Sequence, residues 1–445
     1  MAKTADTRKK FKTRWYHRHP KYWLRKDRPR PPGHRQAPEV VRIDPEPGVS
    51  ASTKPPVRIF LGTEPLQARA ERVFVWSVLK TRDPGRAYEI HLMKNLRGFD
   101  RTGWTTGFTN YRFAIPTLAG GQGRAIYNDV DQIYLADPSE LFDLDMGDAS
   151  ILCVEEDETS VALMDAAKML PHWRVEDAQR GGMKRDFFLG IMNGRGLFGR
   201  MGGEWNARDN EFTADRSKCF HFTTLRTQPW KPFPDQLRYE PHPEGEVWYA
   251  LEREADAARF TTFTRERPGS GFAAAVARLS NGAPAAAGPE KRLQSEVGKL
   301  VAATGAKTVL DYSLPSAEGG PRRFGAATVT TRSSAEAPFA RPVEGSYDGV
   351  AAIDALTGVP EEDVPWALDE LFAAANRFVA VAVAIDADRT ANGAAPLPPE
   401  WWKLQMELAG ARNPGVRWSL AVAEKGGLGA RLQSFAGDAH AAAAA

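Results

Sequence analysis

The sequence predicts an α/β protein with two domains, and three features of the chain support this prediction. At 445 residues, the chain is too long to fold around one hydrophobic core of ordinary size. Strand-like and helix-like apolar patterns alternate over residues 56–262 and again over residues 291–428, which is typical of parallel sheets covered by helices. Between them, residues 263–290 are rich in Ala, Gly and Pro, so we expect a linker there.

Strands and helices alternate in both predicted domains. In the first, VRIFLGTE (57–64) is expected to be a strand, QARAERVFVWSVLKT a helix with apolar residues at helical spacing, and YEIHLMK a second strand. In the second, the helix LQSEVGKLVAAT precedes the strand KTVLDYS, and YDGVAAIDAL, VPWALDELFAAANRF and VAVAVAI repeat the strand–helix–strand order. This order predicts a parallel sheet in each domain.

Composition narrows the class of protein. Hydrophobic residues make up 42% of the chain and charged residues 26%, which indicates a soluble globular protein. The two cysteines, Cys153 and Cys219, form no disulfide framework or zinc-binding spacing, which fits a reducing compartment. The apolar run FVAVAVAI (378–385) is shorter than the ~18–20 residues of a spanning helix, and the N-terminus has no apolar signal segment. We therefore expect a cytoplasmic protein.

Both ends of the chain are expected to be tails. Residues 1–55 are Pro-rich and charged without periodicity, and residues 429–445 are of low complexity. Residues 1–42 carry 14 Lys and Arg against three acidic residues, a net charge of +11, with aromatic residues interspersed. Three interpretations stay open: peripheral binding to the inner face of an anionic membrane, an arm without a partner, and, less favoured, contact with nucleic acid.

The segment GRAIYNDVDQIYL (123–135) places two carboxylates where a buried strand ends. In a parallel sheet, ligands bind at the carboxyl ends of the strands, so Asp129 and Asp131 are expected to share that edge. Two like charges this close would repel unless a cation joined them. Mg²⁺ and Mn²⁺ favour such oxygen ligands, with phosphate oxygens completing the shell. The pair therefore predicts a metal–diphosphate site, although turns also use Asp freely.

Five segments then follow one another in a recognisable order. They are VRIFLGTE, NYRFAIPTL (110–118), AIYNDVDQIYLADPSELF (125–142), EWN (204–206) and CFHFTTLRTQPWKPF (219–233). With these segments, residues 57–235 resemble a glycogenin-type retaining glycosyltransferase of the GT-A fold.

The resemblance implies a function and a set of metal ligands. It implies metal-dependent transfer of a sugar from a nucleoside-diphosphate donor, with a UDP-sugar favoured, to a glycan or lipid-linked acceptor in envelope or surface polysaccharide synthesis. The histidine of the closing motif, His221, would be the third metal ligand beside Asp129 and Asp131. An imidazole ligand favours Mn²⁺ over Mg²⁺. Arg112 would lie near the diphosphate.

The closing motif departs from the family pattern at one position. Gln228 stands where the family has a lysine that contacts the diphosphate, and Arg226 or Lys231 would have to supply the missing cation. Asp165 is our candidate catalytic carboxylate near the sugar. Core packing for the tryptophans and solvated positions for the carboxylates stay open as alternatives. The remaining candidates for the nucleotide sugar and its surroundings are Gly62, Thr63, Glu64, Asn128, Glu155, Asp157, Asp186, Asn193, Trp205, Asn206 and Trp230.

Residues 290–425 resemble a class I methyltransferase with a Rossmann-like fold, through GAKTVLDYS, YDGVAAIDALTGVPEEDVPWALDELFAAANRFV and PPEWW. The glycine-rich turn that would admit the methyl donor is replaced by SLPSAEGG, and Asp354 alone remains of a later acidic motif. The resemblance therefore implies a degenerate domain that serves as a scaffold or partner surface. Two alternatives stay open for the whole chain: a non-catalytic assembly protein and an S-adenosylmethionine-dependent methyltransferase.

Overall fold

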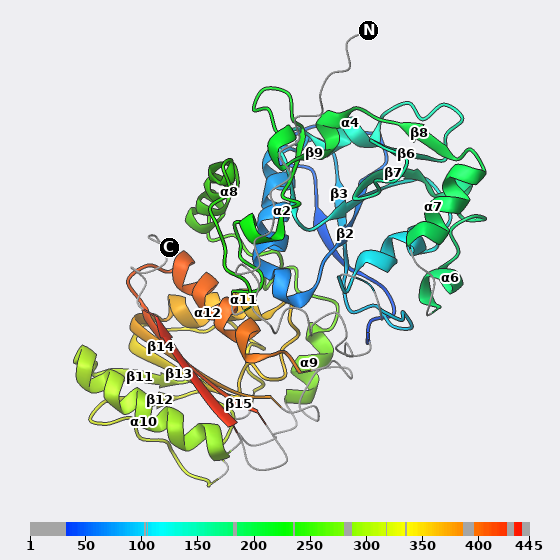
Figure 1. Cartoon of the computed structure of the whole chain (residues 1–445). Helices are drawn as coiled ribbons and strands as arrows, with labels where there is room; N and C mark the ends of the chain where they lie inside the picture. Colours follow the sequence, from blue (N-terminus) through cyan, green and yellow to red (C-terminus); the bar gives the residue numbers. More distant parts are fainter. Residues whose placement is uncertain are drawn as a thin grey trace. The chain divides into compact units, whose positions relative to one another are not determined.

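A computed structural model describes residues 33–101, 104, 106–180, 185–234, 236–279, 287–316, 318–333, 336–385, 396–424 and 431–437 (Figure 1). The chain divides into two compact units, Met1–Ala255 (unit 1) and Asp256–Ala445 (unit 2). Both units are α/β structures rich in parallel strand pairs. Across the helices that the structure describes, none combines the length and the apolar character needed to span a membrane.

Unit 1 is built on a mixed seven-stranded sheet. Its strand order is β1-β3-β2-β4-β7-β6-β8. The inner strand β2 pairs in parallel with β3 and β4, while β7 runs antiparallel to β4. The strands are β1 (Glu39–Ile43), β2 (Val57–Gly62), β3 (Tyr88–Met93), β4 (Arg124–Asp129), β6 (Ile151–Cys153), β7 (Val161–Asp165) and β8 (Phe198–Arg200). Because β2 and β4 are buried and run in the same direction, their carboxyl ends form one edge of the sheet.

The strand that follows β4 in the chain belongs to a small second sheet. It has the order β5-β10-β9, with β5 (Gln132–Tyr134), β9 (Ala207–Arg208) and β10 (Cys219–His221). β10 runs antiparallel to β5, and this register sets His221 opposite Gln132. A two-residue turn therefore separates the end of β4 from the strand that pairs with β10, which brings segments 90 residues apart in sequence to one place.

Helix α2 (Ala68–Thr81) anchors these strands. Its apolar residues Val73, Phe74 and Val78 are fully buried, as their helical spacing predicts, and the helix packs against β5. Ser77 of α2 accepts a hydrogen bond from the backbone N–H of Tyr134. The other helical segments of unit 1 are η2 (Pro65–Gln67), η3 (Thr109–Ala114), α3 (Ile115–Leu118), α4 (Pro138–Phe142), α5 (Ala166–Met169), α6 (Val175–Gln179), α7 (Arg185–Gly194), η4 (Gly203–Asn206), η5 (Asp209–Glu211), η6 (Leu225–Thr227) and α8 (Gly245–Ala257).

Unit 2 contains a six-stranded sheet of order β12-β11-β13-β14-β15-β16. The first five strands are parallel, and β16 is antiparallel to β15. Helix α10 packs on one face, and α11 and α12 pack on the other (Figure 1). The elements are α9 (Phe272–Leu279), α10 (Ala287–Thr304), β11 (Thr308–Asp311), β12 (Thr328–Thr331), β13 (Tyr347–Ile353), α11 (Val364–Ala373), β14 (Ala375–Ile385), α12 (Pro399–Arg412), β15 (Arg417–Glu424) and β16 (Arg431–Gly437).

The structure corrects the predicted tails and linker. Within the predicted tail over 1–55, Glu39–Ile43 forms β1, because Val41 and Ile43 alternate into the core while the backbone pairs with β3. Within the predicted linker over 263–290, α9 forms because Phe272 packs edge-on against Trp366. Within the predicted tail over 429–445, β16 pairs with β15. Residues 1–32 hold 12 of the 14 Lys and Arg of residues 1–42 and lie outside the described residues, so the partner of this segment stays a prediction.

Candidate functional site

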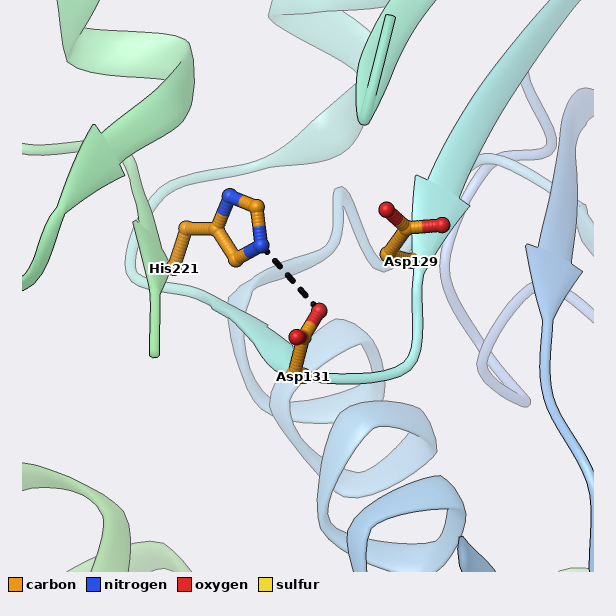
Figure 2. A group of neighbouring side chains, drawn as sticks. All are labelled: Asp129, Asp131 and His221. Atoms are coloured by element: carbon orange, nitrogen blue, oxygen red, sulfur yellow. Dashed lines mark ion pairs between the residues drawn. The ribbon is translucent and has the colours of Figure 1, made fainter. Parts of the chain in front are cut away.

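Three side chains that can bind a metal ion converge at the carboxyl end of β4. Asp129 is the last residue of β4, Asp131 lies in the turn to β5, and His221 ends β10. One ligand atom from each lies within 4.8 Å of the other two. Nε2 of His221 is 3.1 Å from Oδ1 of Asp131, and Figure 2 shows all three side chains turned toward the same space. The structure thus brings together the three residues predicted to be metal ligands.

Backbone hydrogen bonds fix the turn that carries the two aspartates. The N–H of Val130 donates to the carbonyl of Gly62 at the end of β2 (3.0 Å), and the N–H of Asp129 donates to the carbonyl of Ser160 (3.1 Å). The N–H of Phe222, directly after β10, donates to the carbonyl of Asp131 (2.9 Å). Strands from both sheets therefore hold the turn, and the two carboxylates keep a defined separation.

Asp129 is bound to an arginine and a tyrosine. Arg112 of η3 donates from one guanidinium nitrogen to both carboxylate oxygens of Asp129 (2.8 and 3.2 Å), and the Tyr127 hydroxyl also donates to this carboxylate. The guanidinium carbon of Arg112 lies 4.5 Å from the centroid of the Tyr127 ring. Burial raises the pKa of Asp129, and the charge of Asp131 raises it further, while Arg112 acts in the opposite direction. One arginine thus compensates one of the two carboxylates.

The position and protonation of His221 follow from its neighbours. Nδ1 of His221 lies 2.8 Å from Oδ1 of Asn206, and the amide nitrogen of Asn206 donates to the Ser160 hydroxyl (3.2 Å). An amide oxygen accepts only, so Nδ1 carries a proton and Nε2 faces Asp131. Burial alone would lower the pKa of His221, but the carboxylates of Asp131, Asp129 and Glu158 outweigh it and raise the pKa. Between Nε2 and Asp131 the site therefore needs a proton or a metal ion.

Oε1 of Gln228 is buried and has no hydrogen bond within the described part of the chain. Oδ1 of Asp131 is also buried, and it faces Nε2 of His221 at 3.1 Å. A buried acceptor without a donor is costly, and such atoms in native proteins usually mark a bound ion, water or ligand. Two carboxylates and one imidazole are a donor set suited to Mn²⁺ or Mg²⁺, with the imidazole favouring Mn²⁺. The residues present therefore fit a divalent cation.

Several other predicted residues border these ligands. Gly62 pairs in register with Asp129, and a Cβ at Gly62 would lie 2.3 Å from the Tyr127 hydroxyl, so only glycine leaves room for that ring. Asn206 contacts His221, as described above. Gln228 donates to Oδ2 of Asp131 (3.2 Å). Arg112 has its guanidinium against Asp129 and the Thr159 hydroxyl (3.2 Å), and its contact with a diphosphate stays a prediction.

The structure corrects the prediction that Asp165 is catalytic. Asp165 is the last residue of β7, and the antiparallel register pairs it with Arg124, the first residue of β4. Its carboxylate caps α5 by accepting from the N–H of Lys168 (3.0 Å). Five residues of strand separate this position from Asp129, which is about 17 Å. A carboxylate that follows a strand is at the ligand edge only if that strand runs parallel to β4, and β7 does not.

Three further residues predicted to contact the sugar or nucleotide are buried in the core. Asn128 points to the opposite face of β4 from Asp129, where its amide bonds to Gln132 and to the Tyr134 hydroxyl. Trp205 is 2% exposed, and its ring packs edge-on to Tyr134. The indole N–H of Trp230 donates to Gln67 (2.6 Å). These placements correct the predicted contacts and agree with the core-packing alternative for both tryptophans.

The remaining candidates are paired with other residues, half-buried or exposed. Thr63 is buried and donates to Glu71 (3.0 Å), while Glu64 is half-buried. Of the two cations proposed to replace the family lysine, Arg226 is paired with Glu240 (3.3 Å), and Lys231 is exposed in a left-handed turn with φ of 47°. Glu155 pairs with Arg208, and Asp157, Asp186 and Asn193 are exposed. Lys231 therefore stays a prediction as the compensating cation.

The sequence predictions missed four residues that surround the ligands: Tyr127, Glu158, Thr159 and Ser160. Tyr127 shares a face of β4 with Asp129, so the period of two along a strand was sufficient to find it. The other three lie directly before β7, and finding them requires knowing that β7 pairs with β4. Burial alone would raise the pKa of Glu158, but His221, Ser160 and Arg112 hold it below the ordinary value. Glu158 therefore adds negative charge to the site.

Comparison with known proteins gives limited matches. No family model matches the chain. "Protein CDI" from Arabidopsis thaliana is 34% identical over 118 residues, which cover 24% of this chain and 44% of that protein. This chain therefore aligns with less than half the length of its curated relative.

Similar solved structures are glycosyltransferases by title. A bifunctional glycosyltransferase, WbbM, shares 13% identity and a TM-score of 0.32 over 47% of this chain and 53% of its own. The galactosyltransferase LgtC, solved with donor and acceptor sugar analogues, shares 14% identity and a TM-score of 0.32 over 44% of this chain and 95% of its own. GlyE from Streptococcus pneumoniae TIGR4 shares 11% identity and a TM-score of 0.34 over 82% of this chain and 80% of its own. At these TM-scores, function has to be argued from this chain's own residues.

Proposed function

We propose that unit 1 is a metal-dependent glycosyltransferase that moves a sugar from a nucleoside-diphosphate donor, favouring a UDP-sugar, to a glycan or lipid-linked acceptor. The observation that carries this proposal is the convergence of Asp129, Asp131 and His221 at the carboxyl end of β4. This is the edge of a parallel strand pair at which α/β proteins bind ligands. The order of motifs that resembles the glycogenin type supports the same activity, with retention of configuration.

The ligands and their neighbours have separate tasks in this proposal. Asp129, Asp131 and His221 would hold Mn²⁺, and the bound cation would offset the negative charge that develops on the leaving diphosphate. Asn206 keeps the proton on Nδ1 of His221, so that Nε2 is available as a ligand. Arg112 and Tyr127 hold the Asp129 carboxylate in place. An acceptor in envelope or surface polysaccharide synthesis, presented at a membrane surface near the basic N-terminal residues, extends this proposal.

For unit 2 we propose a methyltransferase-like module that serves as a scaffold or partner surface. Beyond β11, the N–H of Tyr312 donates to the carbonyl of Ala351 (2.7 Å), and the N–H of Leu314 donates to that of Ile353 (3.0 Å). The chain therefore continues alongside β13, where a cofactor-binding fold would turn away through glycines. This continuation supports a module that has lost its ligand.

Thermal unfolding of the full-length protein with Mn²⁺ and a panel of UDP-, GDP-, dTDP- and CMP-sugars tests the proposal. A donor at about 100 times its Kd should stabilise unit 1 by about 2.7 kcal/mol, or roughly 5–10 °C in Tm. The shift should require Mn²⁺ and should be lost in Asp129→Ala and Asp131→Ala. Asp165→Asn is the matched control, because this carboxylate lies at the other end of the same strand pair and should leave the shift unchanged.

Two other outcomes would replace the proposal. If no nucleotide sugar shifts the Tm of a folded sample, the non-catalytic assembly protein becomes the better interpretation. If S-adenosylmethionine shifts the Tm and no nucleotide sugar does, the methyltransferase alternative is favoured.

A further inference from the structure

Gln228 is held against one of the two aspartates of the site. It follows η6, is 5% exposed, and directs its amide nitrogen to Oδ2 of Asp131 (3.2 Å) and to the carbonyl of Phe222 (3.0 Å). Phe222 in turn donates its N–H to the carbonyl of Asp131. Gln228 and Phe222 therefore fix both the side chain and the backbone of Asp131, and Oδ1 is left toward His221.

The hydrogen bonds of the Gln228 amide nitrogen set the orientation of the amide oxygen. Oε1 is buried and has no hydrogen bond from the residues that the structure describes. The nitrogen of the same amide has two acceptors, so a flip of the amide would place its oxygen against the Asp131 carboxylate and the Phe222 carbonyl. The observed orientation is therefore the better one, and Oε1 stays available to a donor that enters with a ligand.

Charge distinguishes Gln228 from the lysine expected at this position. Arg112 already compensates Asp129, whereas Asp131 faces Nε2 of His221 (3.1 Å) and accepts a hydrogen bond from the neutral amide of Gln228. An ammonium group at the same place would form an ion pair with Asp131 and oppose a cation binding to that carboxylate. A neutral donor orients Asp131 and leaves its charge available.

We infer that Gln228 is a positioning residue for the metal site, an inference that rests on the proposed function. It fixes Asp131 with Oδ1 toward His221, adds no positive charge that would compete with a cation, so that the protein binds the cation without a nucleotide, and presents Oε1 to a water or hydroxyl that arrives with the cation. Gln228 acts through Asp131 and does not itself have to touch the metal.

Titration of the full-length protein with Mn²⁺ alone, followed by calorimetry and by the electron paramagnetic resonance signal of free Mn²⁺, tests this inference. Gln228→Met keeps the length of the side chain and removes both polar atoms, so Mn²⁺ affinity should fall about 10- to 100-fold, as for other residues that orient metal ligands. Gln228→Lys should weaken Mn²⁺ binding at least as much, because it adds a competing cation. Gln228→Leu repeats the first comparison if the methionine variant does not fold.

Gln236 provides the matched control. Its side-chain oxygen is also buried without a hydrogen bond among the described residues, but it makes no hydrogen bond to Asp129, Asp131 or His221. Gln236→Met should therefore bind Mn²⁺ within twofold of the wild type. If Gln228→Met or Gln228→Lys also binds within twofold, the inference is overturned while the proposed function stands. If the wild type itself binds no Mn²⁺, the proposed function fails instead.

Discussion

The carboxyl ends of β4 and β11 contain similar groups in different arrangements. Each strand ends in an aspartate, Asp129 in unit 1 and Asp311 in unit 2, and each aspartate is paired with a buried arginine. Each also has a second carboxylate nearby. In unit 2, Arg322 lies between the two carboxylates, 2.7 Å from Glu290 and 3.3 Å from Asp311, and also donates to the carbonyl of Leu314.

In unit 1 the arginine reaches only one carboxylate. Arg112 is 2.8 Å from Asp129, while Asp131 is left with His221 and the neutral amide of Gln228. Glu158 and His221 also border the cluster of unit 1. Arg112 with Asp129 and Asp131 nevertheless has the same formal charge as Arg322 with Glu290 and Asp311, so the formal charge does not distinguish these two groups. The position of the arginine does: between the carboxylates it takes the place that a metal ion would occupy, and beside one of them it leaves room for that ion.

The largest expected effect is the loss of Arg322. Arg322→Met leaves Glu290 and Asp311, whose side chains are at most 3% exposed, without their cation, so unit 2 should lose about 3–5 kcal/mol of stability. Denaturant unfolding of the full-length chain measures this loss. Arg377→Met is the control, because Arg377 is half-exposed beside Asp348, and it should cost at most about 1 kcal/mol. Equal losses in the two variants would contradict the buried role of Arg322.

The loss of Arg112 should also destabilise the protein, but, unlike the loss of Arg322, it should be reversed by a metal ion. Arg112→Met leaves Asp129 uncompensated and should cost unit 1 about 3 kcal/mol without metal. Saturating Mn²⁺ should recover much of this loss, because a cation at Asp129, Asp131 and His221 supplies the missing positive charge. The same Mn²⁺ should not recover Arg322→Met, whose cluster has no histidine among the residues that the structure describes. Recovery of both variants, or of neither, would remove the contrast between the clusters.

The contrast between the clusters shows what the sequence could predict. Asp129 and Asp131 were predictable because an apolar run that ends in polar residues marks a strand end in an α/β fold. The same pattern wrongly included Asp165, and it could not predict that Arg322 lies between Glu290 and Asp311. The position of Asp165 and the contacts of Arg322 both depend on how distant segments of the chain pair. Trp205 and Asn206 are adjacent in sequence, yet one packs in the core and the other contacts His221. Only tertiary structure separates such neighbours.

Acid should destabilise the two units unequally through His91. His91 stacks on Phe60 with ring centroids 4.3 Å apart and lies 3.7 Å from Glu89. Burial lowers the pKa of His91 to about 4, assisted by the charges of Arg58 and Arg42. The folded state keeps His91 neutral while the unfolded chain takes up a proton near pH 6.5, so this stability is present above pH 6.5 and is lost as the pH falls toward 4.

Between pH 7 and pH 5 the loss should be about 2 kcal/mol. His91→Phe should remove this part of the acid sensitivity, and unfolding curves at the two pH values measure it. The described residues of unit 2 include no histidine, so unit 2 should not share this component. A wild type and a His91→Phe variant with the same pH dependence would show that His91 is not the source.

The smallest expected effect concerns how Asn206 prepares His221. Asn206→Leu removes the acceptor at Nδ1, so the proton is free to move to Nε2 and Mn²⁺ affinity should fall roughly tenfold, equivalent to about 1.4 kcal/mol. Asn206→Asp restores an acceptor at the same place and should bind Mn²⁺ more tightly than the leucine variant, measured by titration at pH 7.5. A purely structural role predicts that both substitutions weaken binding alike. Recovery by aspartate would show that the tautomer of His221, and not the packing of residue 206, prepares this site for a cation that the cluster of unit 2 excludes.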